Sequence, residues 1–294
     1  MLAYWQDRFW LEYLSNPACE HIPPGHTLLT SSADGRHWER PGEIFPVYSL
    51  PEDCDYAFPD GTRLPTGYFA TMHQRMGFYV SAGGRLLALG FYGICGSAKD
   101  LPNDGSGIGR VVREIRGPGE FGPIHFIRYN RHAGWNEENT AFPFYTMAAD
   151  QGFVEACTEL LENKLMTQQW WEEDRSDDGF YAVQGDGLGY EKNLKAFCWY
   201  TLPDGATMGI WKFAQAALSP DKGATWSRPA AQDTIVANGA KIWGQRLGDG
   251  QYILVNTPVT DGHRRWPLAL IQSEDGRRFH DMLLVNGKVS PLRY

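Results

Sequence analysis

Residues 219–226 read SPDKGATW, and the intervals between the hydroxyl, the acid, the glycine and the tryptophan match neither a helix nor a strand. The stretch follows an apolar run, KFAQAAL, that is typical of a β-strand. In a turn, Asp221 can accept backbone N–H bonds, Gly223 can take a positive φ angle, and Trp226 can pack back between strands. The stretch therefore predicts a hairpin turn rather than a chemical site.

Two shorter copies of this stretch occur, SADGRHW at 32–38 and SEDGRRF at 273–279. Each follows a β-like run, HTLLT or PLALIQ, so each predicts a hairpin turn as well. The interval between the second and third copies fits one four-stranded propeller blade of about 40 to 50 residues plus its loops. The interval between the first and second copies leaves room for two or three blades that lack such a turn.

The composition is that of a turn-rich β protein. Aromatic residues make up 14% of the 294 residues and include 11 Trp and 14 Tyr, and the chain also contains 33 Gly and 18 Pro. Aromatic residues favour strands, and Gly and Pro favour the turns between them. The composition thus predicts an all-β chain. From the composition together with the repeated turns, the blade-length interval between them and a count of strand-like runs, we expect a multi-bladed β-propeller with about five blades, formed by residues 1–294 as a single domain.

One segment breaks the β pattern. From 153 to 171 the sequence FVEACTELLENKLMTQQWW contains no Pro or Gly. Its apolar residues Val154, Cys157, Leu161 and Leu165 recur at helical spacing. We expect a helical insertion near 153–173.

Charge and hydropathy disfavour two classes of partner. The net charge is −8 and the pI is about 5.5, whereas binding a nucleic acid requires clustered Lys and Arg. No apolar run reaches the roughly 18 residues of a membrane span, and MLAYWQDRFW lacks the features of a signal peptide. We expect no nucleic-acid or membrane partner. The compartment stays unknown, and it would be extracellular or periplasmic if a signal peptide preceded this sequence in a longer parent.

No cofactor or metal motif is assigned. The run GSGIGR at 105–110 precedes a strand-like segment, whereas a dinucleotide fingerprint precedes a helix. The cysteines, histidines and acidic residues show no metal-ligand spacing.

Polar and aromatic side chains gather in four stretches where inner strands of a propeller would end. The stretches are TMHQRMGFY (71–79), FIRYNRHAGWNEEN (126–139), WWEEDR (170–175) with YEKNLKAF (190–197), and AKIWGQR (240–246). Aromatic faces stack on sugar rings, and charged groups bond sugar hydroxyls, so this mixture indicates a carbohydrate ligand. The candidate substrate-binding residues are Arg75, Trp135, Asn136, Glu137, Glu172, Glu173, Lys195, Lys241 and Trp243.

Each of these candidates also has a structural interpretation. The two tryptophans could pack in a core, the two adjacent glutamates could lie at an exposed helix end, and the arginines could be solvated surface residues. The sequence leaves both interpretations open.

Beyond these patterns, SPDKGATW resembles the Asp box, or BNR repeat, of the sialidase-like β-propellers, where it is a structural turn away from the active site. Further stretches resemble propeller enzymes that act on the rhamnosyl-glucuronate ends of gum arabic-type glycans, the rhamnose-α-1,4-glucuronate lyases and the α-L-rhamnosidases. These stretches are WLEYLSNP, HIPPGHTLL, MHQRMGFYV, GPIHFIRYN, NKLMTQQWWEEDR, KIWGQR and RWPLALIQSEDG. This resemblance implies a seven-bladed ring, so we expect an incomplete C-terminus, with further blades supplied by a longer parent chain or another chain.

The resemblance also implies site residues. A catalytic histidine in the funnel matches His73, and an arginine that neutralises a uronate carboxylate matches Arg131 or Arg128. A Ca²⁺ ion is implied too, although no acidic cluster with calcium-ligand spacing is present. The sialidase site is not matched, because the sequence has neither an FRIP-like motif near its start nor an arginine triad with Tyr and Glu partners.

These roles predict cleavage of a terminal rhamnosyl-glucuronate linkage in a plant-type polysaccharide by β-elimination. An arginine offsets the charge that develops when the C5 proton is removed, and a neutral histidine, with an ordinary pKa of about 6.5, can transfer that proton. One alternative is hydrolysis, by an α-L-rhamnosidase or a sialidase-like glycoside hydrolase. Another is glycan binding without catalysis, because a fold does not determine a function. In each case the expected partner is an oligo- or polysaccharide.

Overall fold

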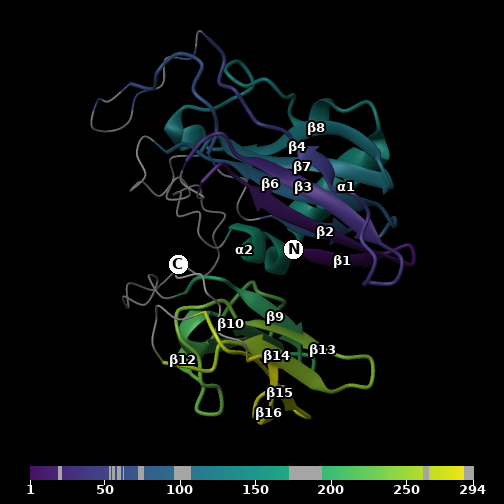
Figure 1. The fold of residues 1–294 in the computed structure, drawn as a ribbon, viewed down its shortest axis with the longest axis vertical. Coiled ribbons are helices and arrows are strands. Elements are labelled where there is room, and N and C mark those ends of the chain that lie inside the picture. The colour runs from purple at the N-terminus through teal and green to yellow at the C-terminus, as the bar shows by residue number, and fades with distance from the viewer. Residues whose placement is uncertain are drawn as a thin grey trace. The chain divides into compact units, whose positions relative to one another are not determined.

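The computed structural model describes residues 1–18, 22–52, 54, 57, 61, 63–71, 76–95, 107–171, 194–260 and 265–287. These residues divide into two compact units. We call them unit 1, which is Met1–Asn163, and unit 2, which starts at Lys164. Figure 1 colours the chain from purple at the N-terminus to yellow at the C-terminus and labels most of its helices and strands.

Unit 1 contains two antiparallel sheets, each with four strands in chain order. Blade 1 consists of β1 (Leu2–Trp5), β2 (Arg8–Ser15), β3 (His26–Ser32) and β4 (Gly42–Phe45). Blade 2 consists of β5 (Gly77–Val80), β6 (Leu86–Tyr92), β7 (Gly109–Gly117) and β8 (Glu120–Tyr129). Every residue of β6 is buried, as expected for a continuous apolar run, LLALGFY, in the interior of a sheet.

Unit 2 repeats this arrangement. Blade 3 consists of β9 (Cys198–Thr201), β10 (Thr207–Ile210), β11 (Gln215–Ser219) and β12 (Ala230–Ala231). Blade 4 consists of β13 (Trp243–Arg246), β14 (Tyr252–Asn256), β15 (Leu268–Ser273) and β16 (His280–Asn286). Within each unit the first strands of the two blades are neighbours, β1 beside β5 and β9 beside β13. This is the relation expected of inner strands in a propeller.

The all-β propeller class is confirmed, but the prediction of about five blades in a seven-bladed ring is wrong for the described residues, which form four blades. The miscount arose in the long interval between the first two SPDKGATW-like stretches. That interval leaves room for two or three blades without such a turn, whereas its described residues contain one complete blade of this kind, blade 2. Its other described residues include the helices α1 and α2, which bury apolar residues without adding strands.

The predicted helical insertion is present as two helices, α1 (Gln151–Glu162) and α2 (Lys164–Trp171). Helix α1 begins at Asp150, whose side chain accepts a hydrogen bond from the Phe153 N–H and thereby caps the first turn. It ends at Asn163, which has extended backbone angles. The short 3₁₀ helices are η1 (Arg131–Ala133), η2 (Tyr145–Met147) and η3 (Lys212–Ala214).

The three SPDKGATW-like stretches all connect the third strand of a blade to the fourth, as predicted, and we call them the Ser–Asp turns. In the turn after β11, the Ser219 hydroxyl donates to Asp221 Oδ1 at 2.9 Å and accepts from the Gly223 N–H at 2.7 Å. Gly223 has a φ of +88°, the left-handed conformation that glycine adopts without strain. The corresponding serine hydroxyls of the turns at 32–38 and 273–279 make the same two contacts at 2.9–3.1 Å.

The aromatic residue of each Ser–Asp turn behaves differently. Trp226 packs edge-on against Phe197 and Trp211, with ring centroids 5.6 Å apart in both pairs, and Phe279 is buried. Trp38, however, is 38% exposed. Blade 1 is filled instead by residues such as Trp10, which lies in the core of unit 1.

Candidate functional site

The connections of each blade lie at two ends, because its strands are antiparallel. The turn end carries the first-to-second and third-to-fourth connections, including the Ser–Asp turns. The loop end carries the second-to-third connection and the links between blades. The two blades of unit 1 share this orientation, because the Trp5 indole after β1 donates to the Gly84 carbonyl after β5 at 2.8 Å. The blades of unit 2 share it as well, because Arg277 and Asp204 at their turn ends form an ion pair at 2.8 Å.

The described candidate residues of both units lie at or beside loop ends. In unit 1, Arg128 is near the end of β8, and Arg131, Trp135, Asn136 and Glu137 follow it. In unit 2, Lys195 precedes β9, Lys241 precedes β13, and Trp243 begins β13. His73, Arg75, Glu172 and Glu173 lie outside the described residues.

Arg131 forms the principal ion pair among the candidates of unit 1. Its guanidinium donates to both carboxylate oxygens of Glu137, at 2.6 and 3.1 Å, and lies 5.3 Å from the centre of the Tyr129 ring. The hydrogen bonds from Arg131 lower the pKa of Glu137, which is therefore ionised at neutral pH. The two side chains are 58% and 47% exposed, and exposed ion pairs are weak, so a ligand carboxylate could displace Glu137 from Arg131.

The other candidates of unit 1 are held within the structure. Trp135 is 1% exposed and belongs to the core of unit 1, so of its two interpretations packing describes its position. The Asn136 amide bonds the Gly134 carbonyl and the Glu138 N–H, and it thereby shapes the loop that carries Glu137. Arg128 pairs across the sheet with Arg110, a buried arginine whose guanidinium lies 4.6 Å from the Phe91 ring centre.

At the loop end of unit 2 the structure brings together residues from separate connections. The Lys212 N–H donates to the Lys195 carbonyl at 3.0 Å, and the Phe213 N–H donates to the Asn238 carbonyl at 3.0 Å. The Asn238 side chain in turn accepts from the Ala240 N–H at 2.7 Å. The connections before β9, after β10 and before β13 are therefore tied into one cluster, which we call the basic loop cluster.

The basic loop cluster is positively charged and aromatic. Arg265, between β14 and β15, joins the cluster by donating to the Gly239 carbonyl at 3.5 Å. The described charged residues of the cluster are then Lys195, Lys212, Asp233, Lys241 and Arg265. Four of these five are basic, although the whole chain carries a net charge of −8. Phe213 and Trp243 are 44% and 45% exposed, so their rings can meet a ligand. Such a surface suits an anionic sugar, because the cations attract its charge and the aromatic faces stack on its C–H groups.

The backbone of this cluster is strained. Ala196, Phe213 and Ala214 have φ angles of +60°, +59° and +53°, a conformation that side-chain-bearing residues seldom adopt. Strain of this kind persists only where surrounding contacts impose it, and it gathers at functional sites.

Sequence reasoning missed Lys212, Phe213, Asn238 and Arg265. The run KFAQAAL (212–218) predicts a strand from its first residue, but its first three residues form η3. The available signals were the Asn–Gly pair at 238–239 and a lysine placed between two aromatic residues at 211–213.

No metal site emerges from the part of the chain that the structure describes. Within it, no three His, Cys, Asp or Glu side chains group closely enough to hold an ion. The described residues therefore do not fit the calcium ion that the family resemblance implies. None of the described helices has both the length and the apolar composition that crossing a membrane requires.

Four-stranded antiparallel blades with Ser–Asp turns define a sialidase-like β-propeller. The chain belongs to the family described as "Beta-prop_BT_1020:-like, N-terminal beta propeller", whose model matches residues 1–187. No curated protein matches the chain. The finer resemblance, to the rhamnose-glucuronate lyases and rhamnosidases, stays a prediction.

Solved structures extend this similarity to the whole chain. A structure named "Sialidase" is 44% identical, with a TM-score of 0.90, and the match covers 100% of this chain and 26% of the other. The chain therefore spans about a quarter of the length of that protein. The leech intramolecular trans-sialidase with 2,7-anhydro-Neu5Ac is 10% identical, with a TM-score of 0.51 and coverage of 92% and 57% of the two chains. The Ruminococcus gnavus intramolecular trans-sialidase with oseltamivir carboxylate is 11% identical, with a TM-score of 0.50 and coverage of 97% and 84%. The last two similarities show the fold alone.

Proposed function

We propose that this propeller is part of a glycan-processing enzyme and binds its substrate. The enzyme is a glycoside hydrolase that acts on a sugar bearing a carboxylate. The observation that carries the proposal is the 44% identity, along the whole chain, to a protein named "Sialidase". The loop ends support it, because they present Arg131 in unit 1 and the basic loop cluster in unit 2.

In this proposal the cationic side chains select the substrate. Arg131 leaves Glu137 and forms a bidentate contact with the sugar carboxylate, which matches the geometry of a guanidinium. Phe213 and Trp243 offer exposed aromatic faces to sugar C–H groups. Hydrolysis also needs a group that protonates the glycosidic oxygen or activates water, and His73 is the candidate for that step.

A second candidate reaction is β-elimination at a rhamnosyl-glucuronate linkage, favoured by the motifs around His73, Arg128 and Arg131. The same arginine would stabilise the charge that develops on the uronate carboxylate when its C5 proton leaves. The electrons of the broken C5–H bond form a C4–C5 double bond as the C4–O bond breaks, and the glycosidic oxygen takes up a proton as it leaves.

The two reactions are distinguished by their products. The protein is incubated in ¹⁸O-labelled water with sialosides and with rhamnosyl-glucuronate oligosaccharides, and the masses of the products are determined by mass spectrometry. Hydrolysis incorporates the oxygen of water into a product, whereas elimination gives an unsaturated uronate that absorbs ultraviolet light. Binding of these sugars without turnover, including in any longer polypeptide that contains the chain, would leave a glycan-binding module and refute both reactions.

The role of Arg131 is tested with the variant Arg131→Gln. Loss of its charge-assisted contact should weaken the binding of carboxylate-bearing sugars at least about tenfold, while neutral sugars should bind equally well. An equal loss for both kinds of sugar would contradict the assignment.

A further inference from the structure

A second site lies at the turn end of blade 2, away from the loop end that carries Arg131. It is a pocket of about 270 Å³ formed within unit 1 by strands β7 and β8 and by the segment that leads into α1. Its polar lining comes from Glu114, Arg116, His125 and Asp150. The apolar lining includes Pro123 and Phe153.

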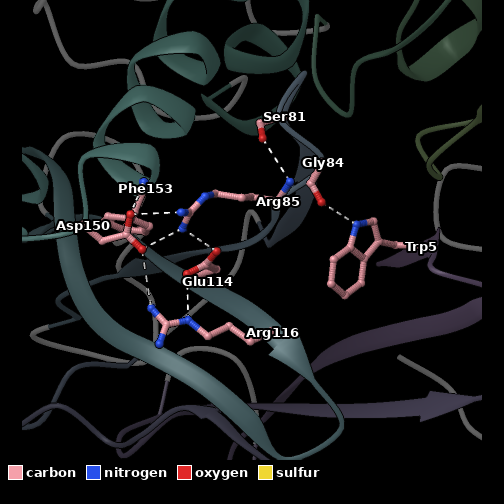
Figure 2. A network of polar contacts seen from close by, with 8 residues as sticks. All are labelled: Trp5, Ser81, Gly84, Arg85, Glu114, Arg116, Asp150 and Phe153. Carbon is pink, nitrogen blue, oxygen red and sulfur yellow. Dashed lines mark hydrogen bonds and ion pairs between the residues drawn. The ribbon is translucent and has the colours of Figure 1, made fainter.

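The polar wall of the pocket is an ordered network of charges. Figure 2 shows Arg85 reaching between Asp150, at the start of α1, and Glu114 on β7. Arg85 donates to both carboxylate oxygens of Asp150, at 2.8 and 3.0 Å, and to Glu114 at 2.8 Å. On the other side of Glu114, Arg116 Nε donates to it at 2.9 Å. Two arginines therefore balance two carboxylates, and the wall carries no net charge.

Arg116 and Asp150 in this wall can still form hydrogen bonds with a ligand. Among the described residues, the terminal nitrogens of Arg116 make no hydrogen bond, and their ion-pair contact with Asp150 is long, at 3.9 Å. Asp150 is 40% exposed, and each carboxylate oxygen can accept more than one hydrogen bond. Arg116 can therefore donate to a hydroxyl group while Asp150 accepts from a neighbouring one.

The rest of the lining is largely apolar. The His125 ring is 5% exposed and lies 5.0 Å from the ring centre of Phe153, which is also buried. Burial lowers the pKa of His125, so this part of the lining is uncharged at neutral pH. Pro123 adds a further apolar face.

Gly122 leaves the pocket open. A Cβ atom at this position would lie 3.5 Å from the terminal nitrogen Nη2 of Arg116 and 3.4 Å from Cβ of Glu114. The methyl carbon itself would fit, but a longer side chain would occupy the space beside the guanidinium. Gly122 thus offers a way to fill the pocket without removing a charge.

We propose that this pocket is a second sugar-binding site that holds one neutral sugar residue. A pyranose ring presents neighbouring hydroxyls along its edge and C–H groups on its face, which match the Arg116–Asp150 edge and the Phe153–Pro123 side. The balanced charges disfavour an anion, and the volume lies just below the 300 Å³ or more of sites for drug-sized molecules. The site goes beyond the proposed reaction, because its ligand follows from its own lining and needs no catalysis.

The test is isothermal titration calorimetry of the full chain with rhamnose, galactose and arabinose, and with neutral oligosaccharides of the same sugars. Gly122→Leu, which fills the pocket, and Arg116→Gln, which removes the free donors, should each weaken binding at least about tenfold. Arg36→Gln is the matched control, because Arg36 is an exposed arginine at the turn end of blade 1. Its affinity should equal that of the unmodified protein.

Each result decides the proposal. Affinity for oligosaccharides but not for monosaccharides would show that the site holds a residue within a glycan chain. Affinity for both would show that a free sugar suffices. The proposal is overturned if the unmodified protein binds none of these sugars, or if both pocket variants bind as it does. It is equally overturned if Arg131→Gln at the loop end abolishes the binding while the pocket variants retain it. A melting curve for each variant separates loss of the site from loss of the fold.

Discussion

The blades of this molecule connect their third strand to their fourth in two different ways. In blades 1, 3 and 4 a Ser–Asp turn connects the third strand to the fourth, and its hydrogen bonds join residues two to four positions apart. In blade 2 that connection is a tight turn between Gly117 and Glu120, and contacts between distant segments surround it. Arg85 there bonds Asp150 across 65 positions and Glu114 across 29. The local hydrogen bonds of a Ser–Asp turn are thus replaced by a tertiary network at the same end of the blade.

The difference follows from where α1 lies. In unit 1 the side chain of Glu159, on α1, accepts from the Tyr79 hydroxyl at 2.5 Å and from the Ala82 N–H at 2.9 Å. These contacts, together with the Arg85–Asp150 pair, hold both ends of α1 against the β5–β6 hairpin. Because the helix supplies partners for the turn end of blade 2, that end does not require a Ser–Asp turn.

The largest expected effect comes from breaking the tertiary network. Arg85→Ala leaves Glu114, whose side chain is only 8% exposed, with one cationic partner and leaves Asp150 without its bidentate contact. Removing one partner of a buried ion pair costs about 3–5 kcal/mol, and the 31% exposure of Arg85 reduces this to roughly 2–4 kcal/mol. Urea unfolding should show the loss, and Arg36→Ala should change stability by less than about 0.5 kcal/mol. Equal stability of the two variants would mean that the network adds no stability.

A smaller loss is expected when a local turn is broken. Ser219→Ala removes the acceptor of the buried Gly223 N–H and the donor to Asp221, while the backbone path of the turn stays available. An unsatisfied buried N–H costs about 1–3 kcal/mol. Thr260→Ala, at an exposed residue, is the control. If Ser219→Ala destabilised the protein more than Arg85→Ala, the ranking of tertiary over local contacts would be wrong.

Acidic pH should also weaken the Ser–Asp turns. Hydrogen bonds from His37, Thr225 and Arg278 lower the pKa of Asp34, Asp221 and Asp275, respectively, below the ordinary value of 3.8.

Because these pKa values are depressed in the folded state, the stabilisation is complete above the ordinary value and is lost as the pH falls through the folded values. The triple variant Asp34→Asn, Asp221→Asn, Asp275→Asn should therefore show a shallower fall in unfolding free energy below about pH 4. Parallel acid limbs for the variant and the unmodified protein would contradict this assignment.

The smallest change in stability is expected for a substitution outside the Ser–Asp turns and the Arg85 network. Leu284 on β16 is 66% exposed, so Leu284→Lys should change the unfolding free energy by less than about 0.5 kcal/mol. The same strand exposes Met282, Leu283 and Val285, and an apolar edge strand promotes aggregation. Light scattering should therefore show less aggregation for the variant. A loss of several kcal/mol would mean that β16 is buried in solution.

Strand propensity and turn chemistry were enough to predict the all-β class, the position of the Ser–Asp turns and the helical segment near 153–173. They failed on the blade count, because the long interval before Ser219 contains loops and helices as well as strands. For the candidate site, the sequence identified Arg131, Lys241 and Trp243 as polar or aromatic residues near strand ends. It could not show that Arg131 is paired with Glu137, nor that Lys212 and Phe213 join Lys195.

The sequence by itself determined the features whose contacts span a few residues. Ser219, Asp221 and Gly223 bond one another wherever the chain turns, so their pattern predicts the turn directly. The tertiary structure alone decided the basic loop cluster and the pocket beside Arg116. Both are assembled from segments that meet only after distant strands have paired, and local sequence patterns do not show which side chains then become neighbours.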